Sequence, residues 1–188
     1  MTDPECGPSA VQGRPLCRRY ALVIPGVAPV HVRDAGGIGK QPLFWVLGWL
    51  ADGECEALGL CLGAQAPPQM LDDFRRRGLE RVWHLEPPDD GCAQEAVGAT
   101  LAIERAFPGA LASSRPHMLP DAAAVARDIG DRLIRAVRRH GHFESEAAAL
   151  DFVVRALQRA ERGLDRERLM ARTQPRLDAN AQVARVAA

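Results

Sequence analysis

The chain has 188 residues, enough for one domain with a hydrophobic core and an added helical segment. Lys plus Arg and Asp plus Glu both number 24, so no overall positive charge marks the protein as nucleic-acid binding. No apolar run reaches the ~20 residues that cross a bilayer, the first residues lack a signal-peptide pattern, and the five cysteines form no Cys-x-x-Cys pair. We therefore expect a cytoplasmic protein with reduced thiols and no membrane partner.

The first third of the chain predicts short strands. Residues 1–19 are rich in Pro, Gly and polar side chains, which predicts a disordered segment. Residues 20–24 are a β-type run ended by Pro25-Gly26. Residues 27–32 are a second run, and Pro29 within it suits a sheet edge or a bulge.

A hairpin and a helix are expected next. Residues 43–50 and 54–62 are apolar runs on either side of Asp52-Gly53, a dipeptide that favours positive φ and closes a tight hairpin. Residues 69–77 then have the pattern of a short helix closed by Gly78.

The middle of the chain alternates strand and helix. Residues 82–85 predict a buried strand, and residues 93–107 have helical spacing up to Pro108-Gly109. Residues 110–114 predict one more short strand.

The remainder predicts helices. Residues 121–139 place apolar side chains four residues apart, which gives one face of an amphipathic helix. Another helix is expected from Ser145, continuing through the Arg- and Glu-rich stretch. Periodicity alone indicates an α+β or α/β fold with a C-terminal helical segment. The expected parts are a disordered segment (1–19), a core (20–120), a helical segment (121–172) and a flexible tail (173–188).

Three motifs occur in the order found in a known enzyme family. They are the Asp52-Gly53 hairpin with Leu58-Gly59 and Leu62-Gly63, then Arg77-Gly78-Leu79 with Val82, then Ala102-Ile103 with Phe107-Pro108-Gly109-Ala110. In this order they resemble the Mutator-type transposases of bacterial insertion sequences. The resemblance covers about residues 20–120. It implies an α/β (α+β), ribonuclease H-like mixed sheet with flanking helices and a C-terminal helical segment.

The resemblance also implies a metal site whose first ligand is missing. Members of this family hold two divalent ions, Mg²⁺ or Mn²⁺, between two Asp and one Glu, and the ions clamp the reacting oxygens at a DNA phosphate. The first Asp ends the first strand, but residues 20–26 contain no acid and end in Pro25-Gly26. Asp34 lies further on and outside the triad. The family relation thus implies DNA as partner and a chain that has lost catalysis.

Asp90, with Asp89 beside it, corresponds best to the second catalytic, metal-binding Asp. The surrounding Pro87 to Gly91 equally has the composition of a solvated turn. Counting back from Phe107 places Gln94 at this position instead.

His117 and Asp178 are the remaining motif residues. His117 keeps the His of a family Cys-x-x-His motif whose Cys is replaced by Ser114, although a lone histidine near a strand end is also a common structural residue. Asp178 would replace the third catalytic acid, a Glu, with Pro175 in place of the motif's Asn.

Two arginine clusters are candidates for contacts with DNA phosphates. They are Arg75, Arg76 and Arg77 on one predicted helix and Arg135, Arg138 and Arg139 on another. Arginine forks bind phosphate well, and the resemblance implies such contacts. Solvated helix faces explain both clusters equally well.

Two further sequence segments resemble a phosphate-binding loop and a metal site, but each lacks residues that such a site requires. Gly36 to Lys40 resembles part of a phosphate loop, but Asp34 and Gln41 occupy its defining positions, so we expect a flexible loop. His140-Gly141-His142 has metal-binding residue types, but nothing nearby supplies thiolates or a paired carboxylate set.

Hypotheses from different classes follow. The first is a degenerate Mutator-type transposase related to DNA transposition. The second is a non-catalytic module that kept the fold and binds DNA, an intact transposase or a second copy of itself. A third is a metal-dependent nuclease that brings Glu86, Asp89 and Asp90 together with Asp178 or Glu95.

Overall fold

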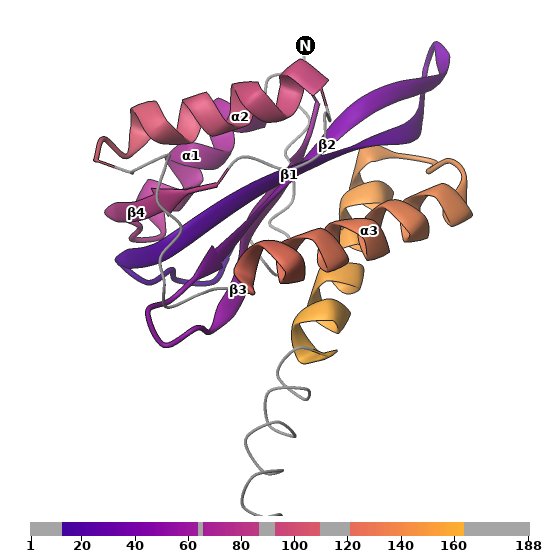
Figure 1. Ribbon diagram of the computed structural model, residues 1–188. Helices are drawn as coiled ribbons and strands as arrows, with labels where there is room; N and C mark the ends of the chain where they lie inside the picture. The colour runs from indigo at the N-terminus through magenta and orange to yellow at the C-terminus, as the bar shows by residue number, and fades with distance from the viewer. Residues whose placement is uncertain (1–12, 64–65, 87–92, 110–120, 164–188) are drawn as a thin grey trace, which may run out of the picture.

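The computed structural model describes residues 13–63, 66–86, 93–109 and 121–163. These residues form a four-stranded mixed sheet with helices on both faces (Figure 1). The strands are β1 (Arg19–Asp34), β2 (Gly37–Trp49), β3 (Cys55–Leu62) and β4 (Arg81–Leu85). The helices are α1 (Ala66–Arg76), α2 (Ala93–Ala106), α3 (Ala122–His140) and a last helix at residues 146–163.

The sheet has the strand order β3-β2-β1-β4. β1 and β2 are antiparallel, as are β2 and β3, while β4 lies parallel to β1. The predicted fold class, a mixed sheet with flanking helices and a helical segment at its C-terminal side, is confirmed. The strand predicted at residues 110–114 lies outside the described residues, as do residues 1–12 and 173–188.

The prediction of two short strands before the hairpin is wrong, because β1 runs without interruption past Pro25 and Pro29. Successive residues of a strand turn their backbone groups to opposite edges. The carbonyl oxygen of Val23 accepts a bond from Glu86, and that of His31 accepts one from Phe143, so odd-numbered residues face away from β2. Both prolines are odd-numbered and lie where β4 no longer pairs with β1. The missing N–H groups therefore break no ladder bond.

The predicted hairpin is confirmed. Gly53 has a φ of 89°, which is the left-handed region that the turn requires. The Leu50 amide donates to the carbonyl oxygen of Glu54 at 2.8 Å, and Asp52 Oδ1 accepts the Glu54 amide at 2.9 Å. β2 and β3 are thus held in the register that places their apolar side chains on both faces of the sheet.

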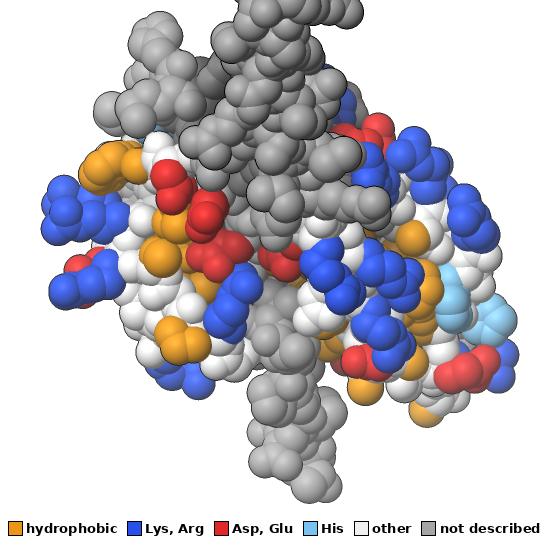
Figure 2. Space-filling model, turned by 90° about the horizontal axis from the view of Figure 1, so that it is seen from below, with side chains coloured by type: hydrophobic (Ala, Val, Ile, Leu, Met, Phe, Trp, Pro, Cys, Tyr) orange, Lys and Arg blue, Asp and Glu red, His pale blue; other side chains and the backbone are white. Residues whose placement is uncertain are grey.

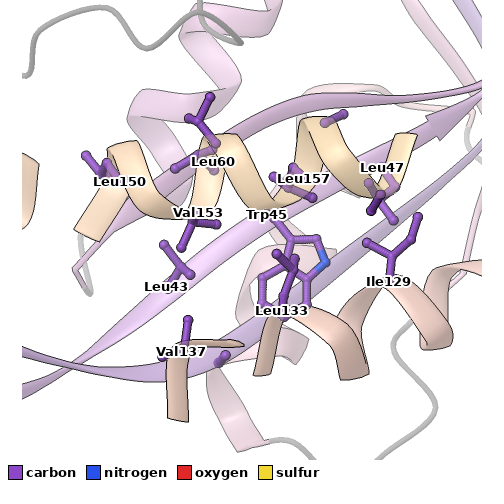
Figure 3. Close-up of a cluster of buried hydrophobic side chains, with 14 of the residues drawn as sticks. Leu43, Trp45, Leu47, Leu60, Ile129, Leu133, Val137, Leu150, Val153 and Leu157 are labelled. Atoms are coloured by element: carbon purple, nitrogen blue, oxygen red, sulfur yellow. The ribbon is translucent and has the colours of Figure 1, made fainter. Parts of the chain in front are cut away.

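Each face of the sheet carries its own hydrophobic core. α3 and the helix at residues 146–163 cover one face, where Ile129, Leu133 and Val137 pack against Trp45 and its neighbours (Figure 3). α1 and α2 cover the other face, where Tyr20, Val46 and several α1 side chains are buried together (Figure 1). The apolar side chains that recur every four residues in α3 therefore form the face of the helix that packs on the sheet, as predicted.

Residues 13–18, here called the N-terminal strap, lie against the sheet although the sequence predicts disorder there. Leu16 is buried, and its amide donates to the carbonyl oxygen of Arg77 at 2.9 Å. Arg18 forms an ion pair with Glu80, which precedes β4. None of the described helices combines the length and apolar character needed to cross a membrane.

Candidate functional site

Gly26 occupies the stretch of β1 where the family resemblance places the first metal ligand. It pairs directly with Trp45 on β2, and the indole occupies the space above it. A Cβ atom at Gly26 would lie 2.2 Å from Cε2 of Trp45 and 2.4 Å from Nε1, distances that real Cβ atoms do not adopt. No side chain, and therefore no carboxylate, fits at Gly26 while the indole holds this place.

The Trp45 ring is fixed from its other side as well. A Cβ at Gly130 on α3 would be 3.4 Å from Cζ2 of the indole, an ordinary contact distance, so α3 lies directly against the ring. Trp45 is only 4% exposed and shares its core with Leu43, Leu47 and Leu133 (Figure 3). The space above Gly26 is thus apolar and closely packed, and an unpaired carboxylate there would bear a large desolvation cost.

The residues that the structure describes do not fit a two-metal site. Mg²⁺ takes hard oxygen ligands, usually carboxylates. Where the resemblance places the first of them on β1, the Trp45 indole of β2 fills the space instead. Among the described side chains, no group of three or more His, Cys, Asp or Glu is placed to hold a metal ion. We therefore assign no metal chemistry to this face.

The second and third acids cannot be placed. Asp89 and Asp90 lie outside the described residues, as do His117 and Asp178. Glu86 is described: it directly follows β4, and its amide donates to the carbonyl oxygen of Val23 at 3.1 Å. The end of β4 therefore lies beside β1. In the neighbouring part of β1, residues 20–26, the described chain has no acidic side chain.

Arg77 has a structural task that the sequence did not reveal. Its side chain is 7% exposed and lies 2.9 Å from Asp73 Oδ2 through Nη1. The same nitrogen donates to the carbonyl oxygen of Leu58 at 2.6 Å, and Nε donates to that of Arg14 at 2.7 Å. Arg77 is therefore buried, unlike its two neighbours, and a role for it in DNA binding stays a prediction.

The two other arginines of α1 are exposed but engaged. Arg75 donates to the carbonyl oxygen of Ala106 at 2.9 Å and lies over the Phe107 ring, 5.7 Å from its centroid. Arg76 is 75% exposed and pairs with Asp73 at 3.4 Å. The Arg75 contacts tie α1 to the end of α2, while the Arg76 pair lies within α1. Cations are also favourable at the C-terminal end of a helix.

The second half of α3 is different, because its arginines face solvent. Arg135, Arg138 and Arg139 are all exposed, and no ion pair joins them to another described side chain. Near the middle of α3, Arg132 pairs with Asp128 at 2.6 Å. Figure 2 looks onto the face with α3 and shows Lys and Arg side chains gathered near histidines on its right-hand side. Of the two predicted clusters, this one is free to meet a polyanion.

The two histidines after these arginines serve packing. The His140 ring stacks on Phe143 with centroids 4.1 Å apart, and its Nδ1 lies 3.1 Å from the carbonyl oxygen of His142. His142 Nε2 lies 3.4 Å from Glu144 and 3.5 Å from Arg33. The contact between His142 and Arg33 joins the end of α3 to the β1–β2 hairpin.

A buried tyrosine at the start of β1 was missed by the sequence interpretation. The Tyr20 hydroxyl donates to Glu56 Oε1 on β3 and accepts the Cys17 amide at 3.1 Å. Glu56 Oε2 in turn lies 2.7 Å from Arg14 Nη2. Burial, and then the bonded carboxylate, raise the pKa of Tyr20 well above its usual range. No sequence signal links partners that lie 36 residues apart.

No protein-family model matches the chain, and none of the curated proteins matches it. The resemblance to Mutator-type transposases therefore stays a prediction that rests on the three motifs.

Proposed function

We propose that this protein is a Mutator-type transposase relative with a ribonuclease H-like core that no longer carries out strand transfer. The observation that carries the proposal is the Trp45 indole over Gly26, within the stretch of residues 20–26 where the resemblance places the first metal-binding Asp. The mixed sheet and the order of its elements support the ribonuclease H-like core.

The proposal follows from what the reaction needs. Two metal ions stabilise the attacking and leaving oxygens only when carboxylates from different strands hold both ions. One acid after β4 gives a half-built site with little affinity for Mg²⁺. Because Trp45 is packed between β1 and α3, a small shift of side chains does not make room for the missing ligand.

Calorimetry with Mg²⁺ and Mn²⁺ tests the loss of catalysis. We expect no saturable binding at millimolar metal, either by the wild-type protein or by the double variant Asp89→Ala/Asp90→Ala, with circular dichroism showing that both are folded. Saturable binding by the wild type that the double variant lacks would mean that a metal site survives, and would overturn the proposal.

A second candidate function is a non-catalytic module that binds DNA through α3. What favours it is the group of exposed arginines on the second half of α3, which has no acidic partner among the described side chains. Such a surface binds the phosphate backbone without reading sequence. The two candidates are compatible, because binding needs no metal site, and the arginine variants described below test the second.

A further inference from the structure

Charged side chains from three distant parts of the chain bind the outer edge of β3 at Ala57 and Leu58. β3 is the last strand on its side of the described sheet, so its outward backbone groups lack a ladder partner. Arg14 Nη2 donates to the carbonyl oxygen of Ala57 at 3.4 Å, and Glu161 Oε1 accepts the Ala57 amide at 2.5 Å. Arg77 Nη1 donates to the carbonyl oxygen of Leu58 at 2.6 Å.

These contacts lie where the edge is irregular. Val46 pairs with Gly59 and Leu47 pairs with Ala57, so a β-bulge leaves Leu58 without a partner on β2. A bulge disturbs the alternation of inward and outward groups, and adjacent residues here both direct carbonyl oxygens to the outside. Edge groups of this kind can pair with a strand of another chain.

The closing side chains also hold one another. Arg14 is fixed by Glu56 at 2.7 Å, and Arg77 is fixed by Asp73 at 2.9 Å. Arg77 Nε donates to the carbonyl oxygen of Arg14 at 2.7 Å, which joins the N-terminal strap to α1. Glu161 adds the last helix to the same edge. Elements that meet only in the folded chain therefore close the edge together.

We propose that Arg14, Arg77 and Glu161 form an edge lock that keeps β3 from pairing with β3 of a second copy of this chain. A second copy is the natural partner for an open edge, since an antiparallel β3–β3 pair about a twofold axis is self-complementary and uses the same groups on both sides. In the edge lock, side chains form the hydrogen bonds to Ala57 and Leu58 that a further strand would otherwise form, so the sheet ends at β3. This inference is independent of the proposed function.

The test removes the side chains that bind Ala57. It then measures the hydrogen-exchange rate of the Ala57 amide and the oligomeric state of the protein. Arg14→Ala/Glu161→Ala frees the amide and the carbonyl of Ala57 and leaves the buried Arg77 in place. Arg14→Lys/Glu161→Gln is the matched control, because it keeps a donor and an acceptor. Light scattering over a concentration series gives the mass, and hydrogen exchange reports the amide of Ala57.

We expect the control to remain monomeric at every concentration. The alanine pair should exchange its Ala57 amide about 10- to 100-fold faster when dilute, which is the loss of one hydrogen bond to a charged group, and should form dimers as concentration rises. A folded alanine pair with a fast-exchanging Ala57 amide that stays monomeric overturns the edge lock. Should the pair not fold, Glu161→Ala against Glu161→Gln decides, and equal monomer content in these two also overturns it.

Discussion

Gly26 shows how one aromatic ring fixes the identity of a residue on the neighbouring strand. The Trp45 indole fills the place of any side chain at this position, and the ring also lies close to Gly130 on α3. Glycine is therefore required here for space, although its φ is ordinary for a strand. Protein interiors are close-packed, so neighbouring side chains have little free volume into which the indole could move.

A stability measurement tests this requirement. Gly26→Ala should lower the free energy of unfolding by about 1–3 kcal/mol, the usual cost of overpacking a core. Gly98→Ala on α2 is the control, since no atom lies within 4 Å of its Cβ position and alanine favours helix by ~1 kcal/mol. Urea denaturation gives both values. A Gly26→Ala protein as stable as the wild type would mean that the ring moves aside easily.

Tyr20 is the only tyrosine of the chain, so its ionisation can be followed without interference. Burial and the Glu56 carboxylate raise its pKa in the folded protein, whereas the unfolded chain ionises near pH ~10. Below that pH, Tyr20 is protonated in both the folded and the unfolded state, so it contributes no pH dependence to the free energy of unfolding. Above it only the unfolded chain loses the proton, so stability falls as pH rises toward the folded pKa.

Alkaline unfolding tests the state of Tyr20. The wild-type free energy of unfolding should fall above pH ~10 by up to ~1.4 kcal/mol per pH unit from this residue. Tyr20→Phe should remove that part of the slope and cost ~1.5–3 kcal/mol at neutral pH through the lost bond to Glu56. Tyrosinate absorbance of the folded protein appearing near pH ~10 would contradict the burial.

Elements differ in how far the sequence predicts them. α3 was predicted within a residue at each end because four-residue spacing and the Gly141 stop are local signals. β1 was divided wrongly, because the acceptability of Pro25 and Pro29 depends on where β4 ends, which no local pattern encodes. Arg77 resembled its neighbours in sequence, yet its partners lie 19 and 63 residues away.

We expect substitutions in the two arginine clusters to have different effects on DNA binding. Replacing Arg135, Arg138 and Arg139 by alanine should weaken binding to any duplex and reduce the salt slope of log K by about 0.9 for each phosphate that the protein no longer neutralises. Arg75→Ala/Arg76→Ala is the comparison, because those arginines are engaged within the protein, and it should leave the slope nearly unchanged. Fluorescence anisotropy at several salt concentrations measures both. Equal effects of the two sets would argue against a surface on α3.

On the scale of the whole molecule, the sheet joins two cores into one structure. β1 and β2 supply side chains to both, so neither pair of helices can leave without exposing strands that the other pair needs. Figure 1 shows the sheet between the two helical layers. The segment after residue 121 thus completes a face of the sheet within the described part of the chain.

Unfolding should accordingly be cooperative. Trp45 and Trp49 are buried in the core under α3, so their fluorescence reports that face, while far-UV circular dichroism reports all helices and strands. We expect the two signals to change together across a urea titration. Trp83 is exposed and contributes little change. A fluorescence transition that precedes the loss of helix signal would show that α3 and the last helix detach first.

The packing of Trp45 has a consequence for how the sequence of this chain can change. Placing a carboxylate at Gly26 needs two substitutions, an acid on β1 and a smaller side chain on β2. Each change alone is harmful, since the first overpacks the core and the second leaves a cavity that costs about 3–5 kcal/mol. Marginally stable proteins rarely survive such intermediates. If the proposed relation to transposases holds, a carboxylate at this position is therefore reached only through an intermediate that is less stable than the present protein.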